Sequence, residues 1–284
     1  MPLPITTLRR GPSTYTLRPG LFADVPSFAH VYYDSFSDTR PGASTDNLMD
    51  ILFGDFRSHP RDTRAVLAAM LAPRLWSLQY RMSALVDDAT GQVVGFVCVK
   101  RPATEISFYE RWLSPQTWLH RLYTVMHSIA SFVRPPGAAL DTTQAASFTR
   151  AFVDLEPQVR CSPRRRAAWY LSIVAVLPGH QGRGLGGAML RAALDHIDAV
   201  GARQPLQTPN DAGSHETEAA AAAAKGEEVD IGGPAVWLTA RKGTEGLYRR
   251  FGFVKVMDSN KGPLSAWNGG AVMFRGLRGV VDLS

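Results

Sequence analysis

The most informative part of the sequence reads Leu171-Ser172-Ile173-Val174-Ala175-Val176-Leu177-Pro178-Gly179-His180-Gln181-Gly182-Arg183-Gly184-Leu185-Gly186-Gly187. It begins inside a nearly all-apolar run, Trp169 to Val176, which predicts a strand buried on both faces. Glycines crowd the loop that follows, and apolar spacing predicts a helix over 184–200. Strand, glycine loop and helix in this order indicate an α/β fold.

The glycine loop has the properties of an anion site. N–H groups at a helix start have no partner within the helix, and the helix dipole makes that end positive. Glycines let the backbone approach a phosphate closely, and Arg183 adds positive charge. The loop therefore predicts a diphosphate ligand.

Other interpretations of the loop fit less well. Gly182, Gly184 and Gly187 match the spacing of a dinucleotide-binding turn, but residues 177–181 separate them from the strand, and such a turn follows its strand directly. No acidic strand end lies about twenty residues on. The Gly-Lys-Ser/Thr of a P-loop is absent from the sequence. A turn without any ligand remains an alternative.

The remaining pattern predicts about seven strands with helices between them, in a mixed α/β sheet. Helices are expected after Asp24-Val25-Pro26, around 66–71 with an end at Pro73, and over 119–133, whereas 37–62 reads as polar and turn-rich. The expected strands are 14–18, two in the hairpin 83–100, 169–176, 235–240, 253–257 and 267–275.

The length of 284 residues suits one enlarged domain, and we assign 1–284 to a single domain with two insertions. Residues 101–153 are rich in aromatic side chains and are expected to form a wall or lid over an acceptor site. Residues 203–234 contain six consecutive alanines and six acidic but two basic side chains. We expect this second insertion to be disordered.

Composition excludes several classes. The chain has no run of eighteen apolar residues, so no membrane association is expected, and its two cysteines cannot form a disulfide framework or a CxxC metal site. No metal is therefore expected, and the default location is cytoplasmic. Aromatic residues do not interleave the run Arg164-Arg165-Arg166, which argues against nucleic acid. The net charge of +6 suits an anionic ligand.

Two segments resemble a known family. Gln181-Gly182-Arg183-Gly184-Leu185-Gly186 resembles the Gln/Arg-x-x-Gly-x-Gly/Ala signature of the GCN5-related N-acetyltransferase (GNAT) family. Gly246-Leu247-Tyr248-Arg249-Arg250-Phe251-Gly252-Phe253 is similar to the family's Leu-Tyr-x-x-x-Gly-Phe. The resemblance is closest to stand-alone fungal members. It covers 14–36, 83–100, 169–200 and 235–275.

The resemblance implies a mostly antiparallel sheet whose fourth and fifth strands, here 169–176 and 235–240, splay apart around acetyl-CoA. Backbone of the fourth strand would pair with the pantetheine arm, and the loop would hold the pyrophosphate. Arg241 stands where relatives often have an asparagine, and it would meet a phosphate instead. The implied binding residues are Val174, Ala175, Val176, Gln181, Gly182, Arg183, Gly184, Leu185, Gly186, Gly187 and Arg241.

The resemblance also implies catalytic roles. Tyr248 would protonate the departing CoA thiolate; from its residue type alone it could equally be a core aromatic. Many relatives carry a glutamate on the fourth strand where this chain has Ser172, which could hold a water. Glu156 and Asp154 are alternative bases, unless they are ordinary solvated carboxylates. His180 and His196 are weaker candidates.

The implied function is acetyl-CoA-dependent N-acetyl transfer to an amine of a small molecule, by direct attack. No cysteine lies in either motif, which disfavours a covalent enzyme intermediate. The alternatives are a non-catalytic CoA-binding module of the same fold and O-acyl transfer to a hydroxyl acceptor. The protein is expected to be a monomer or homodimer.

Overall fold

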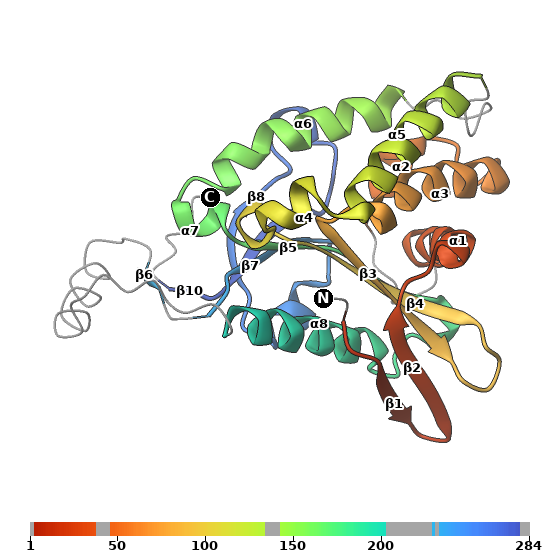
Figure 1. Cartoon of the computed structure of the whole chain (residues 1–284), viewed down its shortest axis with the longest axis horizontal. Helices are drawn as coiled ribbons and strands as arrows, with labels where there is room; N and C mark the ends of the chain where they lie inside the picture. Colours follow the sequence, from red (N-terminus) through yellow and green to blue (C-terminus); the bar gives the residue numbers. More distant parts are fainter. Residues whose placement is uncertain (1–2, 38–45, 134–142, 203–228, 231–232, 279–284) are drawn as a thin grey trace.

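A computed structural model describes residues 3–37, 46–133, 143–202, 229–230 and 233–278. Its centre is an eight-stranded sheet in the order β1-β2-β3-β4-β5-β7-β9-β8 (Figure 1). Neighbouring strands are antiparallel except β5 and β7. The strands are β1 (Thr6–Arg10), β2 (Ser13–Pro19), β3 (Tyr80–Asp87), β4 (Val93–Lys100), β5 (Trp169–Val176), β7 (Val236–Ala240), β8 (Val254–Asp258) and β9 (Ala271–Arg275).

The predicted mixed, mostly antiparallel α/β fold is confirmed, with one strand more than expected in the large sheet. The additional strand is β1, an edge strand of largely exposed residues that joins β2 through a turn at Gly11, where φ is +61°. Its residues, Thr6-Thr7-Leu8-Arg9-Arg10, show little apolar alternation, so the sequence pattern missed it. A second, two-stranded sheet joins β6 (Val229–Asp230) to β10 (Leu277–Arg278).

Helices cover both faces of the large sheet, with α8 on one side and α5 and α6 on the other (Figure 1). The α-helices are α1 (Val25–Phe36), α2 (Leu48–Phe53), α3 (Pro60–Trp76), α4 (Phe108–Trp112), α5 (Pro115–Val133), α6 (Thr143–Val159), α7 (Pro163–Arg166), α8 (Leu185–Gly201) and α10 (Glu245–Arg249). Short 3-10 turns are η1 (Phe22–Asp24), η2 (Ala103–Glu105), η3 (Pro178–His180) and η4 (Gly262–Leu264). No helix of the described residues is long and apolar enough to cross a membrane.

Two expectations for the N-terminal half are wrong. The stretch expected to be turn-rich contains α2, whose Met49, Leu52 and Phe53 are buried against α1 and α3. Pro73 does not end its helix, because α3 continues to Trp76. Proline removes the N–H that would bond to the carbonyl four residues earlier, yet the chain stays helical here, and Ser77 N donates to Pro73 O at 3.1 Å.

The main core lies between the sheet and α8. The five helix residues predicted to point inward are all buried, and they pack with buried side chains of β4 and β5. The five residues are Met189, Leu190, Ala193, Leu194 and Ile197. On α1, the ring of Phe28 lies 4.9 Å from that of Phe96 on β4. This packing fixes α8, and with it the glycine loop, against β5.

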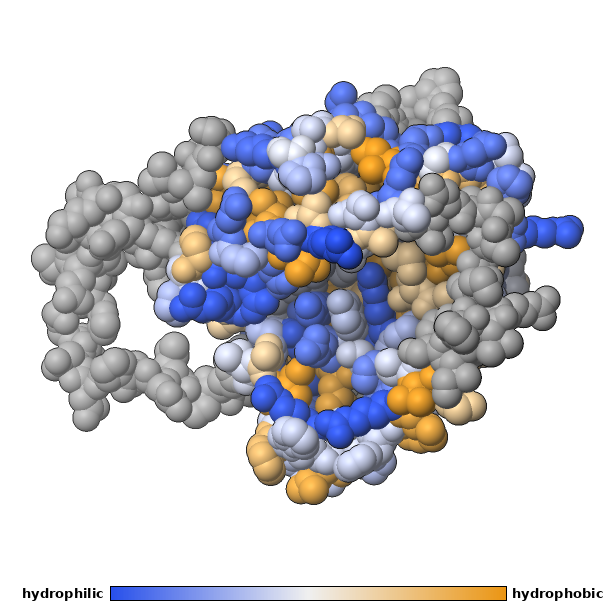
Figure 2. Space-filling model, turned by 90° about the horizontal axis from the view of Figure 1, so that it is seen from above, coloured by the Kyte–Doolittle hydropathy of each residue, from blue (hydrophilic) through white to orange (hydrophobic). Residues whose placement is uncertain are grey.

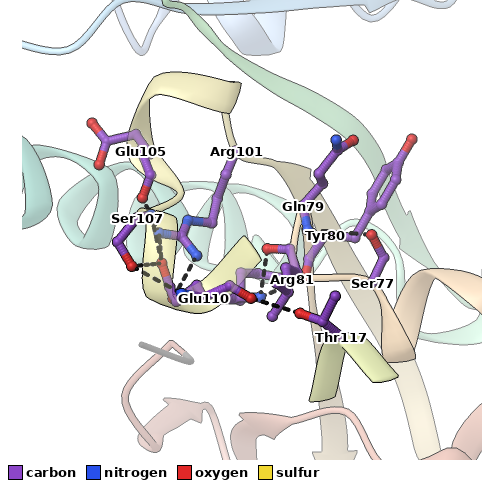
Figure 3. A network of polar contacts seen from close by, with 10 residues as sticks. Ser77, Gln79, Tyr80, Arg81, Arg101, Glu105, Ser107, Glu110 and Thr117 are labelled. Atoms are coloured by element: carbon purple, nitrogen blue, oxygen red, sulfur yellow. Dashed lines mark hydrogen bonds and ion pairs between the residues drawn. The ribbon is translucent and has the colours of Figure 1, made fainter. Parts of the chain in front are cut away.

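The first part of the aromatic insertion is ordered and fastened to the sheet. Arg101 N donates to Gln79 O at 2.6 Å, and the Arg101 guanidinium pairs with Glu110 on α4 at 3.3 Å (Figure 3). Ser107 and Glu110 form a reciprocal cap at the start of α4, and Thr117 Oγ1 donates to Glu110 O at 2.6 Å. The start of α5 is thereby anchored too.

Many apolar side chains of this insertion are exposed, as the mixed surface of Figure 2 illustrates. They include Phe108, Trp112, Trp118, Leu119 and Leu122 on α4 and α5. The second expected insertion, 203–234, lies outside the described residues except for 229–230 and 233–234.

Asp24 holds the junction between β2 and α1. Its carboxylate accepts from both terminal nitrogens of Arg18, at 2.7 and 2.8 Å, and from Leu21 N at 2.8 Å. Burial alone would raise the pKa of Asp24, but the Arg18 hydrogen bond and charge, with the Leu21 N–H, outweigh it and hold this pKa below its usual range. The helix begins where the sequence predicts, although Asp24 caps the preceding turn rather than α1.

Asp24→Asn should lower the free energy of unfolding by about 1–3 kcal/mol, because it leaves the Arg18 guanidinium without its counter-charge. Since the folded-state pKa of Asp24 is lowered, this contribution is complete above the unfolded pKa, about 3.9. It disappears as pH falls through the folded-state value. Urea unfolding of both proteins between pH 2 and 7 measures the difference. The exposed Asp50, which pairs with Arg57, supplies the control Asp50→Asn, expected within about 0.5 kcal/mol of the parent. A difference that stayed constant down to pH 2 would contradict this assignment.

Candidate functional site

A gap opens between β5 and β7. The two strands pair in parallel only at Trp169–Val236, Tyr170–Trp237 and Leu171–Leu238, although β5 continues to Val176 and β7 to Ala240. The predicted splaying of 169–176 from 235–240 is therefore confirmed.

The gap begins at a bulge in β5. Cys98 of β4 stands opposite Ile173, and the next residue, Val99, stands opposite Leu171, so Ser172 is the extra residue. A bulge bends its strand and increases its twist. The last pair between β5 and β7 lies immediately before Ser172, which places the bend where the two strands part.

Beyond the bulge, the backbone of β5 presents polar groups to the gap. Leu177 N donates to Val94 O at 2.8 Å, so the antiparallel alternation turns the peptide groups of Val174 and Val176 away from β4. Those of Ala175 face β4. The Val176 carbonyl already accepts from Ser35 Oγ and Gln181 Nε2, each at 2.8 Å. Of the predicted backbone groups, only the N–H and carbonyl of Val174 and the N–H of Val176 therefore face the gap and remain available to an extended ligand.

The glycine loop leads directly from this edge into α8. Gly182 and Gly184 have φ of +76° and +75°, values that disfavour any side chain, and Gly184 is the N-cap of α8. The first helical bond runs from Ala188 N to Gly184 O at 3.0 Å. The N–H groups of residues 185–187 therefore have no acceptor within the helix, as an anion site requires.

Arg183 is exposed, but its guanidinium is held in place by contacts with the N-terminal hairpin and the loop. Its Nη1 donates to Tyr15 Oη at 3.0 Å and its Nη2 to Gly179 O at 3.2 Å. Tyr15 also lies 3.4 Å from His180 Nδ1. These contacts hold a positive charge beside the loop.

A cavity of about 440 Å³ occupies the gap. Residues 170–176 of β5, Gln181 and Gly186 line one part of it, and Thr239, Arg241, Thr244, Leu247 and Tyr248 line the part beyond β7. Apolar side chains of α1, α2, α3 and α6 close the remainder. Among the described residues that line it, none is aspartate, glutamate or histidine. The cavity thus brings together Tyr248, Ser172, Arg241, the predicted strand residues and, from the loop, Gln181 and Gly186. Glu156 and the other predicted loop residues do not line it.

Tyr248 is partly buried in this cavity, edge-on to Phe253 with ring centres 6.0 Å apart. Burial raises the pKa of Tyr248 to about 12 against the opposing charge of Arg241. The phenol therefore keeps its proton at neutral pH. Arg241 donates from Nη1 to Ser35 O at 3.1 Å, and its guanidinium lies 4.3 Å from the centre of the Phe36 ring.

The candidate bases lie in different places. Ser172 Oγ accepts from Arg74 Nη1 at 3.2 Å inside the cavity. Glu156 pairs with Arg160 on its own helix at 2.7 Å and lies outside the cavity, and Asp154 is exposed on the same helix. His196 lines a different cavity.

Sequence reasoning missed Arg74, the other arginine of the cavity. The premature helix end at Pro73 hid its position, although a helix continued through it would place Arg74 on the face of Leu67 and Leu71. A charged residue on an otherwise buried helix face was the available signal.

It also missed Asp46, a buried carboxylate behind a cavity wall. Asp46 accepts from Trp267 Nε1 at 3.1 Å, from Leu48 N at 2.9 Å and from Lys242 N at 3.1 Å. It thereby joins the start of α2 to Trp267, which lines the cavity. With three N–H donors on it, Asp46 serves the wall rather than proton transfer.

A second cavity, of about 770 Å³, adjoins the start of α8. Gly184 and Gly187 line it together with Arg10, Arg191 and Arg250, which come from three separate elements or turns. Asp195 is the acidic residue among the described lining residues. Positive charge therefore continues from the glycine loop across this surface.

Comparison with known proteins identifies the family. Residues 45–216, over half of the chain, match the model of the Acetyltransferase (GNAT) family. That span includes the bulge and the glycine loop but ends before Tyr248. No curated protein sequence matches the chain significantly.

Solved structures with a similar outline have low identity. One, described as histone acetyltransferase HPA2 and related acetyltransferase from Corynebacterium glutamicum, is 17% identical with a TM-score of 0.46, covering 91% of this chain and 94% of that one. PaiA N-acetyltransferase from Thermoplasma acidophilum, solved with coenzyme A, is 9% identical with a TM-score of 0.43. The match covers 92% of this chain and 98% of that one. An acetyltransferase from Thermus thermophilus is 14% identical with a TM-score of 0.35, and the match covers 93% of this chain and 96% of that one.

At such low identities and TM-scores the solved structures do not identify the family, whereas the match to the family model does. A GNAT protein is an acetyltransferase that uses acetyl-CoA. The chain belongs to the GNAT family of acetyltransferases.

Proposed function

We propose that this protein transfers the acetyl group of acetyl-CoA to an amine of a small molecule by direct attack. The observation that carries the proposal is the gap at Ser172. It unites the free backbone groups of Val174, the N–H groups at the start of α8 and the Tyr248 hydroxyl around one cavity.

The described residues fit acetyl-CoA as a co-substrate. The peptide groups of Val174 and the Val176 N–H can pair with the amides of an extended arm, as an added strand would. The unpaired N–H groups of 185–187 suit the pyrophosphate. Arg10, Arg191 and Arg250 surround the neighbouring cavity, where they suit further phosphate. In this scheme Arg183 supplies charge from a position fixed by Tyr15.

Acetyl-CoA supplies an acyl group activated as a thioester. The acceptor nitrogen forms a bond to the acetyl carbon, the carbon–sulfur bond breaks, and the leaving sulfur takes the proton of Tyr248. The acceptor nitrogen gives its own proton to water, and water returns a proton to the Tyr248 phenolate. Arg241, whose charge acts on Tyr248, lies where it favours the developing negative charge. Its side chain points to Ser35 O, so we assign Arg241 to this end of the cavity rather than to a phosphate.

The acceptor nitrogen must lose a proton, and no described carboxylate or histidine lines the cavity. We propose that Ser172 orients the amine, or a water that takes its proton. Its hydroxyl accepts from Arg74 and keeps its own proton for a further bond. Positive charge from Arg241 lowers the pKa of an ammonium bound in the cavity, which favours the neutral amine. Glu156 is the weaker candidate because of its pairing with Arg160.

A covalent enzyme intermediate has little support in the described residues. Cys98 is fully buried, and burial raises the pKa of its thiol against the opposing charge of Arg74. Neither Cys98 nor the exposed Cys161 lines the cavity. Direct transfer therefore remains the simpler route.

The lack of a lining carboxylate favours one alternative, a CoA-binding module without catalysis. O-acyl transfer to a hydroxyl is the other.

The proposal further includes a monomer or homodimer in the cytoplasm, without nucleic acid. In the basic run, Arg165 is buried with its guanidinium 5.0 Å from the centre of the Phe274 ring, and Arg164 donates to Gly233 O and Gly276 O. These arginines hold the fold together.

Acetyl-CoA and CoA should each raise the thermal midpoint. A ligand at a hundred times its dissociation constant adds about 2.7 kcal/mol to stability. NAD is the control, because its pyrophosphate would test the glycine loop without the pantetheine arm. Differential scanning fluorimetry over a concentration series measures the shift. No shift with either CoA species, or a shift with NAD alone, would sink the proposal.

Tyr248→Phe should lower kcat by about a hundredfold or more while leaving the affinity for CoA unchanged, because it removes a proton donor and little volume. Release of free CoA thiol in the presence of a panel of amines measures the rate. Tyr33→Phe is the matched control, since Tyr33 packs on Phe56 away from the cavity. Unchanged turnover in the Tyr248 variant would remove its acid role. Saturable CoA binding without turnover on any amine or alcohol would support the non-catalytic module.

A further inference from the structure

The cavity contains a guanidinium whose described partners are all neutral. Arg74 donates to Ser172 Oγ at 3.2 Å, its guanidinium lies 5.3 Å from the centre of the Tyr80 ring, and its charge acts on the Cys98 thiol. Burial raises the pKa values of Cys98 and Tyr80, so both stay uncharged at neutral pH. Arginine keeps its charge under the same conditions.

Two described carboxylates whose charges reach the tyrosines around Arg74 are committed elsewhere. Asp46 accepts from Trp267 and two backbone N–H groups, and Glu156 pairs with Arg160. No aspartate or glutamate appears among the described residues that line the cavity. A charge withdrawn from water without a counter-ion is costly, whereas a bidentate carboxylate satisfies a guanidinium well. The missing anion is a group that a ligand can bring.

The surroundings of Arg74 define the rest of that ligand. Leu52 and Phe53 of α2 and Phe148 and Phe152 of α6 line the same cavity, on the side formed by the helices. Such a surface favours an apolar side chain and disfavours a second charge. A polyamine or a lysine-rich peptide would place its cations among two arginines and no described acid.

We propose that Arg74 binds a carboxylate of the acceptor, and that the acceptor is an amine carrying both a carboxylate and an apolar side chain, the class of apolar α-amino acids. This inference rests on the proposed acetyltransferase function and specifies its substrate class. With the carboxylate on Arg74, the amine beside it lies near Ser172, which Arg74 already contacts.

Arg74 suits this role better than Arg241. Arg241 donates to Ser35 O and its charge acts on Tyr248, which places it at the end of the cavity assigned to the leaving sulfur. Arg74 lies at the Ser172 end, and its charge acts on Tyr80 and Tyr170 instead. The two cations therefore divide the cavity into a thioester end and an acceptor end.

The test compares ligands that differ only in the carboxylate. The probes are N-acetyl-L-phenylalanine against N-acetylphenethylamine, and N-acetyl-L-leucine against N-acetylisoamylamine. Calorimetry with the full chain, with and without CoA, measures their affinities. The carboxylates should bind at least about tenfold more tightly than their partners, which corresponds to one charge-assisted hydrogen bond.

Arg74→Gln should abolish this preference, and Arg74→Lys should keep part of it, because lysine retains the charge without the bidentate fork. Arg64→Gln is the matched control on the same helix. Arg64 pairs with Asp34 at 3.2 Å outside the cavity, so this variant should keep the full preference. Thermal unfolding of each variant establishes that it is folded.

Equal affinities within each pair, no binding of either carboxylate, or loss of the preference through Arg241→Gln instead of Arg74→Gln would overturn the inference. These binding results do not depend on turnover. A protein that prefers the carboxylates but releases no CoA thiol would contradict acetyl transfer while upholding the site. A protein that acetylates the decarboxylated amines as well as the amino acids would uphold acetyl transfer and contradict the carboxylate site.

Discussion

The site depends on a single change of register between β4 and β5. One extra residue, Ser172, bends β5 so that its partner β7 cannot follow, and the sheet opens along one edge. The same bulge reverses which peptide groups face the gap, leaving those of Val174 available. Without it, a continuous parallel pair of strands would fill the space that the cavity occupies. Buried packing on both sides, from α8 and from α1, holds the bend in place.

The glycine loop gains its function from where this strand ends. Positive φ at Gly182 and Gly184 lets the chain turn from β5 into α8, and the first N–H groups of the helix have no acceptor within it. Ser35 Oγ and Gln181 Nε2 both donate to the Val176 carbonyl, which fixes the end of the strand where the loop begins. Backbone donors for a phosphate and backbone partners for an extended arm thus adjoin each other.

The charges of the site are arranged by helices distant in sequence. Arg74 comes from α3 and Arg241 from the end of β7, and apolar residues of α2 and α6 surround the acceptor end between them. Acidic residues nearby are withdrawn into structural pairs, Asp46 with Trp267 and Glu156 with Arg160. No acid stands among the described residues that line the cavity, and the proposed preference for an acceptor carboxylate rests on this.

The sequence by itself determined the local features of this protein. The apolar run 169–176 predicted β5 with its correct ends, and helical spacing predicted five of the six buried residues of α8, all but Leu185, because both patterns depend on neighbours along the chain. The glycine loop likewise announced an anion site. Only the tertiary structure decided the rest. A bulge at Ser172 is defined by the opposite strand, the Arg74 contact joins residues 98 positions apart, and Glu156 faces Arg160 rather than the cavity. Such relations depend on packing between distant segments, which no local pattern records.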